Sequence, residues 1–371
     1  MSANVCLTPF VHRGVTFKNR VGLAPLTRGR ASFPEGVVSD LHVQYYTQRS
    51  SGGFILTEAT GISRRGLGWY RAPGIYTAEQ IDAWKTVTES VHGAGGKIYL
   101  QLWHMGRCGH SDVFAHPPLA PSAITLEGEV TAAHHEKKPY EIPEAMTNAQ
   151  IQETVAEYKQ AALNAIEAGF DGCQIHSANG YLVDQFLQPV SNQRDDEYGG
   201  SLDNRLRFLK EVLEAVTAAV GPDKTWIRFS PNGAFQGMGC ADNLETFDAA
   251  IQLAASFKIA VIEVMDGTGF GFHEKTERYS LERVRKNANI GNPDKANPTA
   301  IMGNVGHTQA SANQEIGDGH ADLISFGRIY MSNPDLPERF ASGLPLADPP
   351  EYPDWWTKED GDGYITFPNA K

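Results

Sequence analysis

A (β/α)8 (TIM) barrel is the fold class that this sequence predicts, formed as a single domain over residues 1–371. Three observations support it. Eight short apolar runs of strand length recur along the chain, amphipathic helical patterns separate most of them, and polar side chains and glycines gather where the runs end. Strands that alternate with helices build βαβ units, and eight such units close into a barrel.

The predicted strands are near-continuous apolar runs, as expected for a parallel sheet that is buried on both faces. Because the sheet of such a barrel is covered by helices outside and filled by side chains inside, no run needs a polar face. The runs cover Arg20–Leu26, Gly52–Ala59, Lys97–Trp103, Gly172–Ser177, Trp226–Pro231, Ala260–Asp266, Thr299–Asn304 and Asp322–Gly327.

Three of the intervening stretches carry clear helix signals. Residues 77–96 have apolar side chains at helical spacing and end in glycines. Thr147 is a candidate N-cap with Gln150 three residues later, which is the spacing of a capping box. Ser201 begins a third helix and Gly221 ends it.

Two connections are much longer than the others and predict covers over the barrel. They follow strands three and six and span Met105–Met146 and Gly267–Pro298. Long loops in a compact domain are usually functional. The glycine-rich segment Gly267–Phe272 lacks the G-x-G-x-x-G spacing of a dinucleotide-binding turn, so it is predicted to be a mobile loop over a pocket.

Composition excludes several classes of partner. The formal net charge is −12, whereas nucleic acid and anionic membranes are bound by basic surfaces. No apolar run is long enough to span a membrane, and the first residues do not resemble a secretory signal. The cysteines are scattered, which predicts reduced thiols in a cytoplasmic protein without a disulfide framework or a cysteine-bound metal; they are Cys6, Cys108, Cys173 and Cys240.

The carboxyl ends of the barrel strands are where the active site of this fold lies. His176, Asn179 and Tyr181 follow the fourth strand, and the first two side chains can donate to one shared acceptor. Tyr181 is near enough to act on the same ligand. The alternative is that His176 is a satisfied core histidine, Asn179 a turn residue and Tyr181 a packing residue at a helix start.

Gln101 and Arg228 are polar residues inside apolar strands, and buried polar groups need partners. Arg228 can pair with an internal carboxylate, and Gln101 can pair with backbone. A planar heterocycle with several carbonyl oxygens and ring nitrogens would satisfy both side chains at once, which favours a flavin.

The ends of strands seven and eight predict a phosphate site. Gly303 and Gly327 allow backbone N–H groups to approach an anion, and Asn304 and Arg328 add further donors. The alternative is that the glycines only permit tight turns.

Metal and Schiff-base chemistry are not predicted. The carboxylates Glu58 and Glu263 are isolated in the sequence, so no metal site is expected. Lys97 and Lys258 lie at the starts of their strands, which is the wrong end of a barrel for a catalytic lysine.

Six short segments, spread over nearly the whole chain, occur in an order typical of one family. Together they resemble the Old Yellow Enzyme family of FMN-dependent ene-reductases. Thr27 and the third segment are most similar to the branch with plant oxophytodienoate reductases and bacterial N-ethylmaleimide reductases. The segments are APLTR (Ala24–Arg28), GGFILTEAT (Gly52–Thr60), QLWHMGR (Gln101–Arg107), HSANGYLVDQFL (His176–Leu187), NQRDDEYGGSLDNRLRF (Asn192–Phe208) and FGRIYMSNPDLPERF (Phe326–Phe340).

The resemblance implies a role for each matching residue. His176 and Asn179 bind the carbonyl or nitro oxygen of the substrate beside the flavin, Tyr181 donates a proton, and Trp103 and Trp356 contact the substrate. Ala59 stands where many relatives have glycine, and the loop after strand six matches the family poorly. The residues implied to hold FMN are Pro25, Leu26, Thr27, Ala59, Gln101, His176, Asn179, Arg228, Gly303, Asn304, Gly327 and Arg328.

The resemblance also implies the reaction, that of an NAD(P)H:flavin oxidoreductase. Hydride passes from NADPH or NADH through FMN N5 to the β-carbon of an unsaturated aldehyde, ketone, maleimide or nitroalkene. The expected partners are such small activated alkenes, and the expected assembly is a monomer or a homodimer. A flavin-dependent isomerase and a non-catalytic flavin-binding barrel are the alternatives, and Tyr181 counts against the second.

Overall fold

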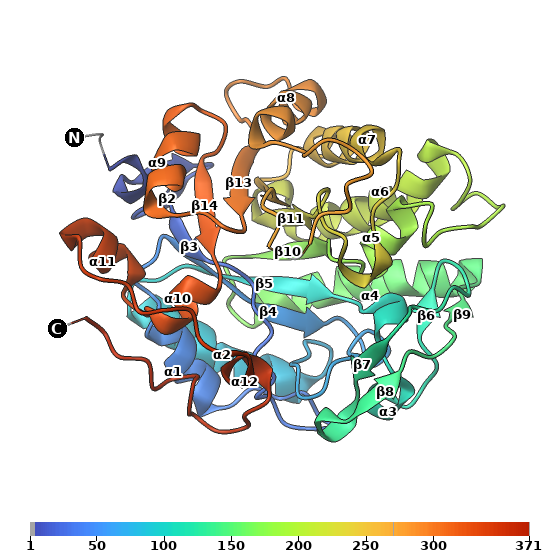
Figure 1. Cartoon of the computed structure of the whole chain (residues 1–371), viewed down its shortest axis with the longest axis horizontal. Helices are drawn as coiled ribbons and strands as arrows, with labels where there is room; N and C mark the ends of the chain where they lie inside the picture. The colour runs from blue at the N-terminus through green and yellow to red at the C-terminus, as the bar shows by residue number, and fades with distance from the viewer. Residues whose placement is uncertain (1–3, 270, 371) are drawn as a thin grey trace.

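Eight parallel strands close into a barrel at the centre of the protein (Figure 1). The structure, a computed structural model, describes residues 4–269 and 271–370. Each barrel strand is buried, and the first pairs with the last, so the predicted (β/α)8 class is confirmed. The strands are β3 (Val21–Leu23), β4 (Phe54–Gly61), β5 (Ile98–Trp103), β10 (Gly172–Ser177), β11 (Thr225–Phe229), β12 (Val261–Met265), β13 (Ala300–Asn304) and β14 (Leu323–Phe326).

Most strand ends differ from their predicted bounds by one or more residues, and the differences are largest at β3 and β4. β3 ends at Leu23, although the apolar run continues to Leu26. The Ala24 N–H still donates to the carbonyl of Phe326, but Pro25 has no N–H with which to continue the ladder. β4 instead runs on to Gly61, with a register shift against β5 between Leu56 and Ala59.

Helices surround the barrel on its outer side (Figure 1). The predicted caps are present: Thr147 and Ser201 each accept a hydrogen bond from the backbone N–H three residues later. Thr77, which was not predicted as a cap, accepts one in the same way. The helices are α1 (Asp40–Thr47), α2 (Ala78–Gly93), α3 (Ser111–Phe114), α4 (Asn148–Glu167), α5 (Leu182–Leu187), α6 (Leu202–Val220), α7 (Asn243–Ser256), α8 (Leu281–Gly291), α9 (Gln309–Gly317), α10 (Arg328–Ser332), α11 (Leu336–Ser342) and α12 (Tyr352–Trp356).

The amino-terminal end of the barrel is closed by a hairpin that the sequence did not reveal. β1 (Phe10–His12) pairs antiparallel with β2 (Val15–Phe17). The Phe17 ring contacts those of Phe54 and Trp226, at centroid distances of 6.2 and 6.3 Å. This plug leaves the opposite, carboxyl end of the strands as the place for a site.

The two long connections are built differently. The one after β5 carries β6 (Leu119–Ala120), which pairs with β9 (Glu144–Ala145). It also holds an antiparallel hairpin of β7 (Glu129–Thr131) and β8 (Lys137–Pro139), at the lower right of Figure 1. The connection after β12 contains helix α8, with a loop on either side of it, and Phe270 in the first of these loops lies outside the described residues.

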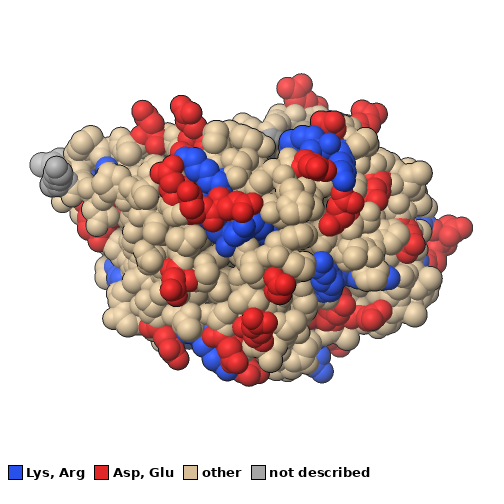
Figure 2. Space-filling model, turned by 90° about the horizontal axis from the view of Figure 1, so that it is seen from below, with Lys and Arg blue, Asp and Glu red and all other residues tan. Residues whose placement is uncertain are grey.

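The face seen in Figure 2 carries acidic and basic side chains interspersed with one another. This distribution agrees with the net charge of −12 and gives no basic stripe on that face. Among the described residues, no helix is both long and apolar enough to span a membrane.

Candidate active site

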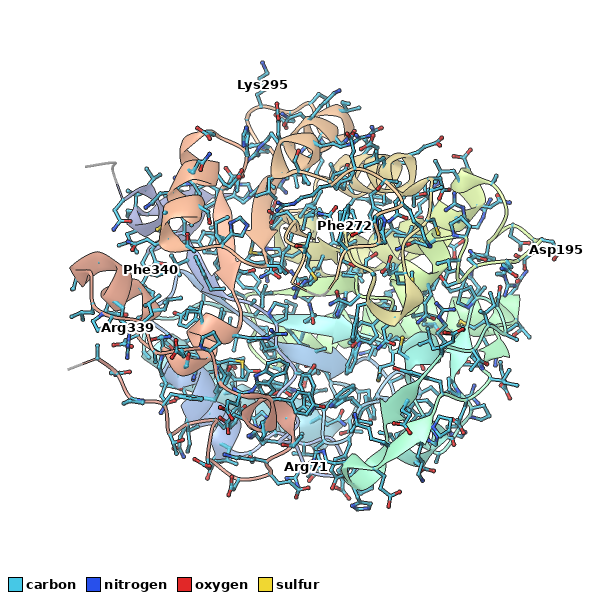
Figure 3. The ribbon with its side chains drawn as sticks, in the orientation of Figure 1. Arg71, Asp195, Phe272, Lys295, Arg339 and Phe340 are labelled. Atoms are coloured by element: carbon cyan, nitrogen blue, oxygen red, sulfur yellow. The ribbon has the colours of Figure 1, made fainter. Side chains whose placement is uncertain are left out.

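A cavity of about 920 Å³ opens at the carboxyl ends of the barrel strands. Its wall reaches from Gly269, in the loop after β12, to Arg339 and Phe340 on α11. In the view of Figure 3, Phe272 of the same loop lies near the centre, and Arg339 and Phe340 lie toward the left edge.

The floor of the cavity is a layer of polar side chains, which we call the interior network. Each member comes from a different barrel strand, and each is at least 96% buried. Gln101 Nε2 donates to Gln174 Oε1 over 2.7 Å, and Gln174 Nε2 donates to Glu263 Oε2 over 2.9 Å. The members are Gln101, Gln174, Arg228, Glu263, Asn304 and Ser325.

The other half of the interior network runs from Glu263 to Arg228. The Ser325 hydroxyl donates to Glu263 Oε1 over 2.6 Å and accepts from Asn304 Nδ2 over 2.7 Å. Asn304 Oδ1 in turn accepts from Arg228 Nη2 over 2.6 Å. Arg228 also pairs directly with Glu263, with Nε 3.5 Å from Oε2. The internal ion pair considered as an alternative for Arg228 is therefore present, and Arg228 still reaches the cavity wall.

His176, Asn179 and Tyr181 meet on one side of the cavity, as predicted. The His176 and Tyr181 rings pack edge to face with centroids 4.9 Å apart. Asn179 has a φ of 57°, a left-handed conformation that asparagine tolerates, and its N–H donates to Ser230 Oγ over 2.7 Å. His176 lies near the end of β10, and this turn carries Asn179 and Tyr181 to the same cavity just before α5 begins.

Burial sets the protonation state of both rings. Desolvation, and then the positive charge of Arg228, hold the pKa of His176 well below its usual value, so the imidazole is neutral at pH 7. Its Nδ1 atom is buried and has no partner among the described residues. Burial also raises the pKa of Tyr181, so its phenol keeps its proton. The pair therefore offers a neutral hydrogen-bonding ring and a proton donor side by side.

One end of the cavity is suited to a phosphate group. After β13 the backbone makes a turn in which Val305 and Gly306 have φ angles of 78° and 80°. A positive φ is costly for a β-branched residue such as Val305. Such strained turns are often found at ligand-binding sites. Gly327 and Arg328 line the same cavity, and a Cβ on Gly327 would meet only Leu26 at an ordinary 3.6 Å. Packing within the protein does not require glycine there.

The mouth of the cavity is aromatic. Trp69 and Trp356 pack edge to face at 5.5 Å, and Trp355 lies beside Trp356 at 5.3 Å. The Arg328 guanidinium lies over the Trp355 ring at 4.0 Å. Phe235, from the loop after β11, completes the apolar wall.

Arg28 holds this aromatic segment in place. Its guanidinium is fully buried and donates to the carbonyl oxygens of Asp354, Trp355 and Gly363, at 2.7–3.0 Å. The backbone N–H of Arg28 donates to Glu58 Oε2 over 3.0 Å. The C-terminal segment is therefore tied to the loop after β3, which carries Thr27 into the cavity.

The structure brings most of the predicted site residues to the cavity wall and leaves two outside it. Trp103 lies behind Tyr181, with ring centroids 5.1 Å apart, and is 1% exposed. Gly303 faces the helices, because a Cβ there would lie 2.8 Å from Leu281. On the wall are Pro25, Leu26, Thr27, Ala59, Gln101, His176, Asn179, Tyr181, Arg228, Asn304, Gly327, Arg328 and Trp356.

Several wall residues were not predicted. Trp69 and Phe235 lie in loops, where an apolar residue does not indicate which way its side chain points. The adjacent residues Trp355 and Trp356 could not be distinguished from the sequence. Val305 and Gly306 directly follow the predicted Asn304, so reading the turn one step further would have found them.

A flavin fits this donor set. The interior network places Gln101 and Arg228 at the cavity wall, and Arg228 Nε has no hydrogen-bond partner among the described residues. The turn at Val305 and Gly306 with Arg328 suits the phosphate at one end. Within the described residues, no group of three or more histidine, cysteine or acidic side chains is arranged to hold a metal.

Comparison with known proteins assigns the family. Residues 7–347 match the model of the NADH:flavin oxidoreductase / NADH oxidase family. A solved structure of the old yellow enzyme homologue from Zymomonas mobilis superposes with a TM-score of 0.91 at 39% identity, covering 98% of this chain and 99% of that one. The chain belongs to the Old Yellow Enzyme family. It is thus an NAD(P)H-dependent flavin oxidoreductase, and a flavin is its cofactor.

Two further members of the Old Yellow Enzyme family are similar over nearly their whole length. A putative 12-oxophytodienoate reductase 11 from Oryza sativa subsp. japonica is 38% identical over 346 residues, which is 92% of this chain and 91% of the relative. Morphinone reductase, solved in complex with tetrahydroNAD, has a TM-score of 0.88 at 33% identity and covers 99% of this chain and 98% of its own.

Proposed function

We propose that the protein is an FMN-dependent ene-reductase that reduces α,β-unsaturated carbonyl compounds with NADPH or NADH. The observation that carries the proposal is the grouping of neutral His176, Asn179 and protonated Tyr181 on one wall of a flavin-sized cavity. When bound, the flavin supplies the hydride that it has received from the nicotinamide. The residues of the chain supply binding, orientation and the proton.

His176 and Asn179 act on the oxygen of the substrate. Each side chain donates one hydrogen bond to the carbonyl or nitro oxygen. These bonds strengthen as the β-carbon takes up hydride and charge moves to that oxygen, which is the principle of an oxyanion hole. A neutral His176 still carries one N–H, so its lowered pKa does not remove the donor.

Tyr181 completes the reduction by protonating the α-carbon. Its burial keeps the phenol protonated at neutral pH, and its position next to His176 places it by the bound carbonyl group. Solvent returns the proton afterwards. Trp103 supports the Tyr181 ring from behind and is proposed to act through it instead of touching substrate.

The cofactor is proposed to be FMN, lying on Gln101 and Arg228, with Pro25, Leu26, Thr27 and Ala59 beside the ring. The phosphate is proposed to lie between the Val305–Gly306 turn and Gly327–Arg328. Gly303 faces the helices and is not proposed to contact the phosphate.

The aromatic mouth favours ring-bearing substrates. Trp69, Phe235 and Trp356 present apolar faces, and flat rings stack well on such walls. A related rice protein carries the name of a 12-oxophytodienoate reductase and a structural neighbour that of a morphinone reductase, which agrees with a cyclic enone. Two further expectations, that the protein is cytoplasmic and that it is a monomer or a homodimer, remain predictions.

A direct assay tests the proposal. Purified protein should carry one FMN per chain and should convert 2-cyclohexenone to cyclohexanone while consuming NADPH or NADH. Protein that takes up no FMN refutes the cofactor. Bound FMN with migration of the double bond and no consumption of nicotinamide would establish an isomerase instead.

A further inference from the structure

Two members of the interior network, Gln174 and Glu263, lie outside the cavity wall. Both side chains are fully buried. Glu263 is the acceptor on which both halves of the network end. Its Oε1 receives the Ser325 hydroxyl and its Oε2 the Gln174 amide. A residue that touches no ligand thus sits at the centre of the contacts beneath the flavin site.

Glu263 fixes the direction of the hydrogen bonds that lead to Gln101. An ionised carboxylate only accepts, so Gln174 must turn its Nε2 toward Glu263 and its Oε1 toward Gln101. Gln101 then uses its Nε2 to donate to Gln174. Its Oε1 is left as the acceptor that Gln101 presents at the cavity wall.

Glu263 also compensates the charge of Arg228. The two side chains face each other in register on β11 and β12, and Arg228 is 4% exposed. In a buried site of low dielectric constant, charges act on one another more strongly than in water. The positive electrostatic potential that Arg228 creates in the cavity is therefore reduced by the negative charge of Glu263.

That balance bears on the redox equilibrium of the flavin. Two-electron reduction with uptake of one proton leaves a flavin with one more negative charge than the oxidised form. A cation beside the ring stabilises this extra charge, and an anion beside the ring opposes it. Removing the anion alone should make reduction more favourable.

We propose that Glu263 is a positioning residue that limits the reduction potential of the bound flavin, by offsetting the charge of Arg228 and by fixing the amide of Gln101 through Gln174. This inference rests on the proposed function of the cavity. It concerns residues that never touch the flavin, and it assigns a role to the carboxylate that a purely structural ion pair would not have.

The test is the midpoint potential of the FMN-loaded protein, measured by slow reduction beside a reference dye. Glu263→Gln keeps the shape of the side chain and removes its charge. We expect the two-electron reduction equilibrium to shift at least tenfold toward the reduced form, which is about 30 mV. Asp248→Asn is the control, because Asp248 pairs with Arg283 at 2.6 Å in the outer layer. It should leave the potential unchanged.

An exchanged variant separates charge from packing. Gln174→Glu combined with Glu263→Gln moves the carboxylate one hydrogen bond along the interior network and keeps the net charge. Its potential should return to within threefold of the wild-type equilibrium. If Glu263→Gln alone does not fold, this variant decides, and a tenfold shift in it overturns the inference.

The outcomes distinguish this inference from the proposed function. Wild-type protein that binds no flavin overturns both. Wild-type protein that binds FMN, together with a Glu263→Gln potential within threefold of wild type, overturns only the role of Glu263 and returns it to a structural ion pair. A shift toward the oxidised form overturns it as well.

Discussion

The His176 imidazole and the Tyr181 phenol pack edge to face on one wall of the cavity, with their ring centroids 4.9 Å apart. Burial lowers the pKa of the first and raises that of the second. The two groups therefore stay in fixed and opposite roles over the neutral pH range. In the proposed reaction, His176 binds the substrate oxygen and Tyr181 gives a proton.

Replacing Tyr181 by phenylalanine separates proton donation from packing. Tyr181→Phe keeps the ring against Trp103 and His176 and removes only the hydroxyl. The half-reaction with NADPH should stay close to wild type, while reduction of 2-cyclohexenone should slow by about 10²–10⁴-fold. Nitroalkenes, whose nitronate product can be protonated later in water, serve as control substrates. Rapid mixing measures both half-reactions, and a wild-type rate with 2-cyclohexenone would exclude Tyr181 as the donor.

Removing both oxygen-binding side chains should abolish phenol binding. His176→Ala with Asn179→Ala should keep FMN, because Gln101, Arg228 and the phosphate turn remain. Each hydrogen bond to a charged oxygen is worth about 1.5–3 kcal/mol, so the affinity for p-hydroxybenzaldehyde should fall more than tenfold. The readout is the long-wavelength charge-transfer absorbance band expected when the phenol stacks on the oxidised flavin. An unchanged band at unchanged affinity would mean that both residues serve the fold alone.

Thr27 is predicted to affect the reaction more than cofactor binding. Thr27 lines the cavity, and its hydroxyl is proposed to form one neutral hydrogen bond with the flavin. Thr27→Ala removes that bond, which is worth about 0.5–1.5 kcal/mol, from a cofactor held by many contacts. FMN content should stay at one per chain while the rate of enone reduction changes. Release of FMN from a folded variant would show that Thr27 has a larger share in binding than its position implies.

The Arg28 contacts predict that the C-terminal segment needs the Arg28 guanidinium to stay packed against the barrel. Arg28→Lys cannot reach all three carbonyl oxygens, and each buried carbonyl left unpaired costs about 1–3 kcal/mol. Limited trypsin digestion after Lys358 should become faster, and the KM for cyclic enones should rise as Trp356 shifts. Arg285→Lys is the control, since Arg285 pairs with Asp322 and, within the part of the chain that the structure describes, does not contact the C-terminal segment. Equal digestion of the two variants would contradict the prediction.

A buried histidine predicts a specific pH dependence of stability. Burial lowers the pKa of His104 to about 3, whereas an unfolded histidine titrates at about 6.5. Below pH 6.5 only the unfolded chain takes up this proton, so the contribution of His104 to stability is lost as the pH falls. Between pH 7 and 5.5 the wild type should lose about 1 kcal/mol relative to His104→Gln, measured by urea unfolding. A constant difference would mean that His104 takes up its proton at the same pH in the folded and the unfolded chain.

The barrel could be predicted because its signals are local. Each strand is an apolar run, and threonine and serine caps mark α2, α4 and α6. The hairpins β1–β2 and β7–β8 were missed because their strands are three residues long and partly exposed. Their pairing depends on contacts with distant parts of the chain.

The site could be predicted where a side chain stands out in an apolar strand or matches a family motif. Considering that side chains alternate between the two faces of a strand would have improved the prediction of which residues line the cavity. Asn304 points inward, so its neighbour Gly303 had to face the helices. The same alternation places Gln174 two residues before His176, on the inner side of β10. Glu263, which the sequence left isolated, could only be joined to Gln174 by the three-dimensional structure, because β11 separates their strands.

The most direct measurement of the central claim is an anaerobic reoxidation experiment. Wild-type protein loaded with FMN is reduced by one equivalent of NADPH, which bleaches its absorbance, and is then mixed with 2-cyclohexenone. The yellow absorbance should return at a rate that rises and then saturates with enone concentration, and one cyclohexanone should form per flavin. Reduced flavin that stays bleached in the presence of the enone would contradict the assignment of this cavity as the active site of an ene-reductase.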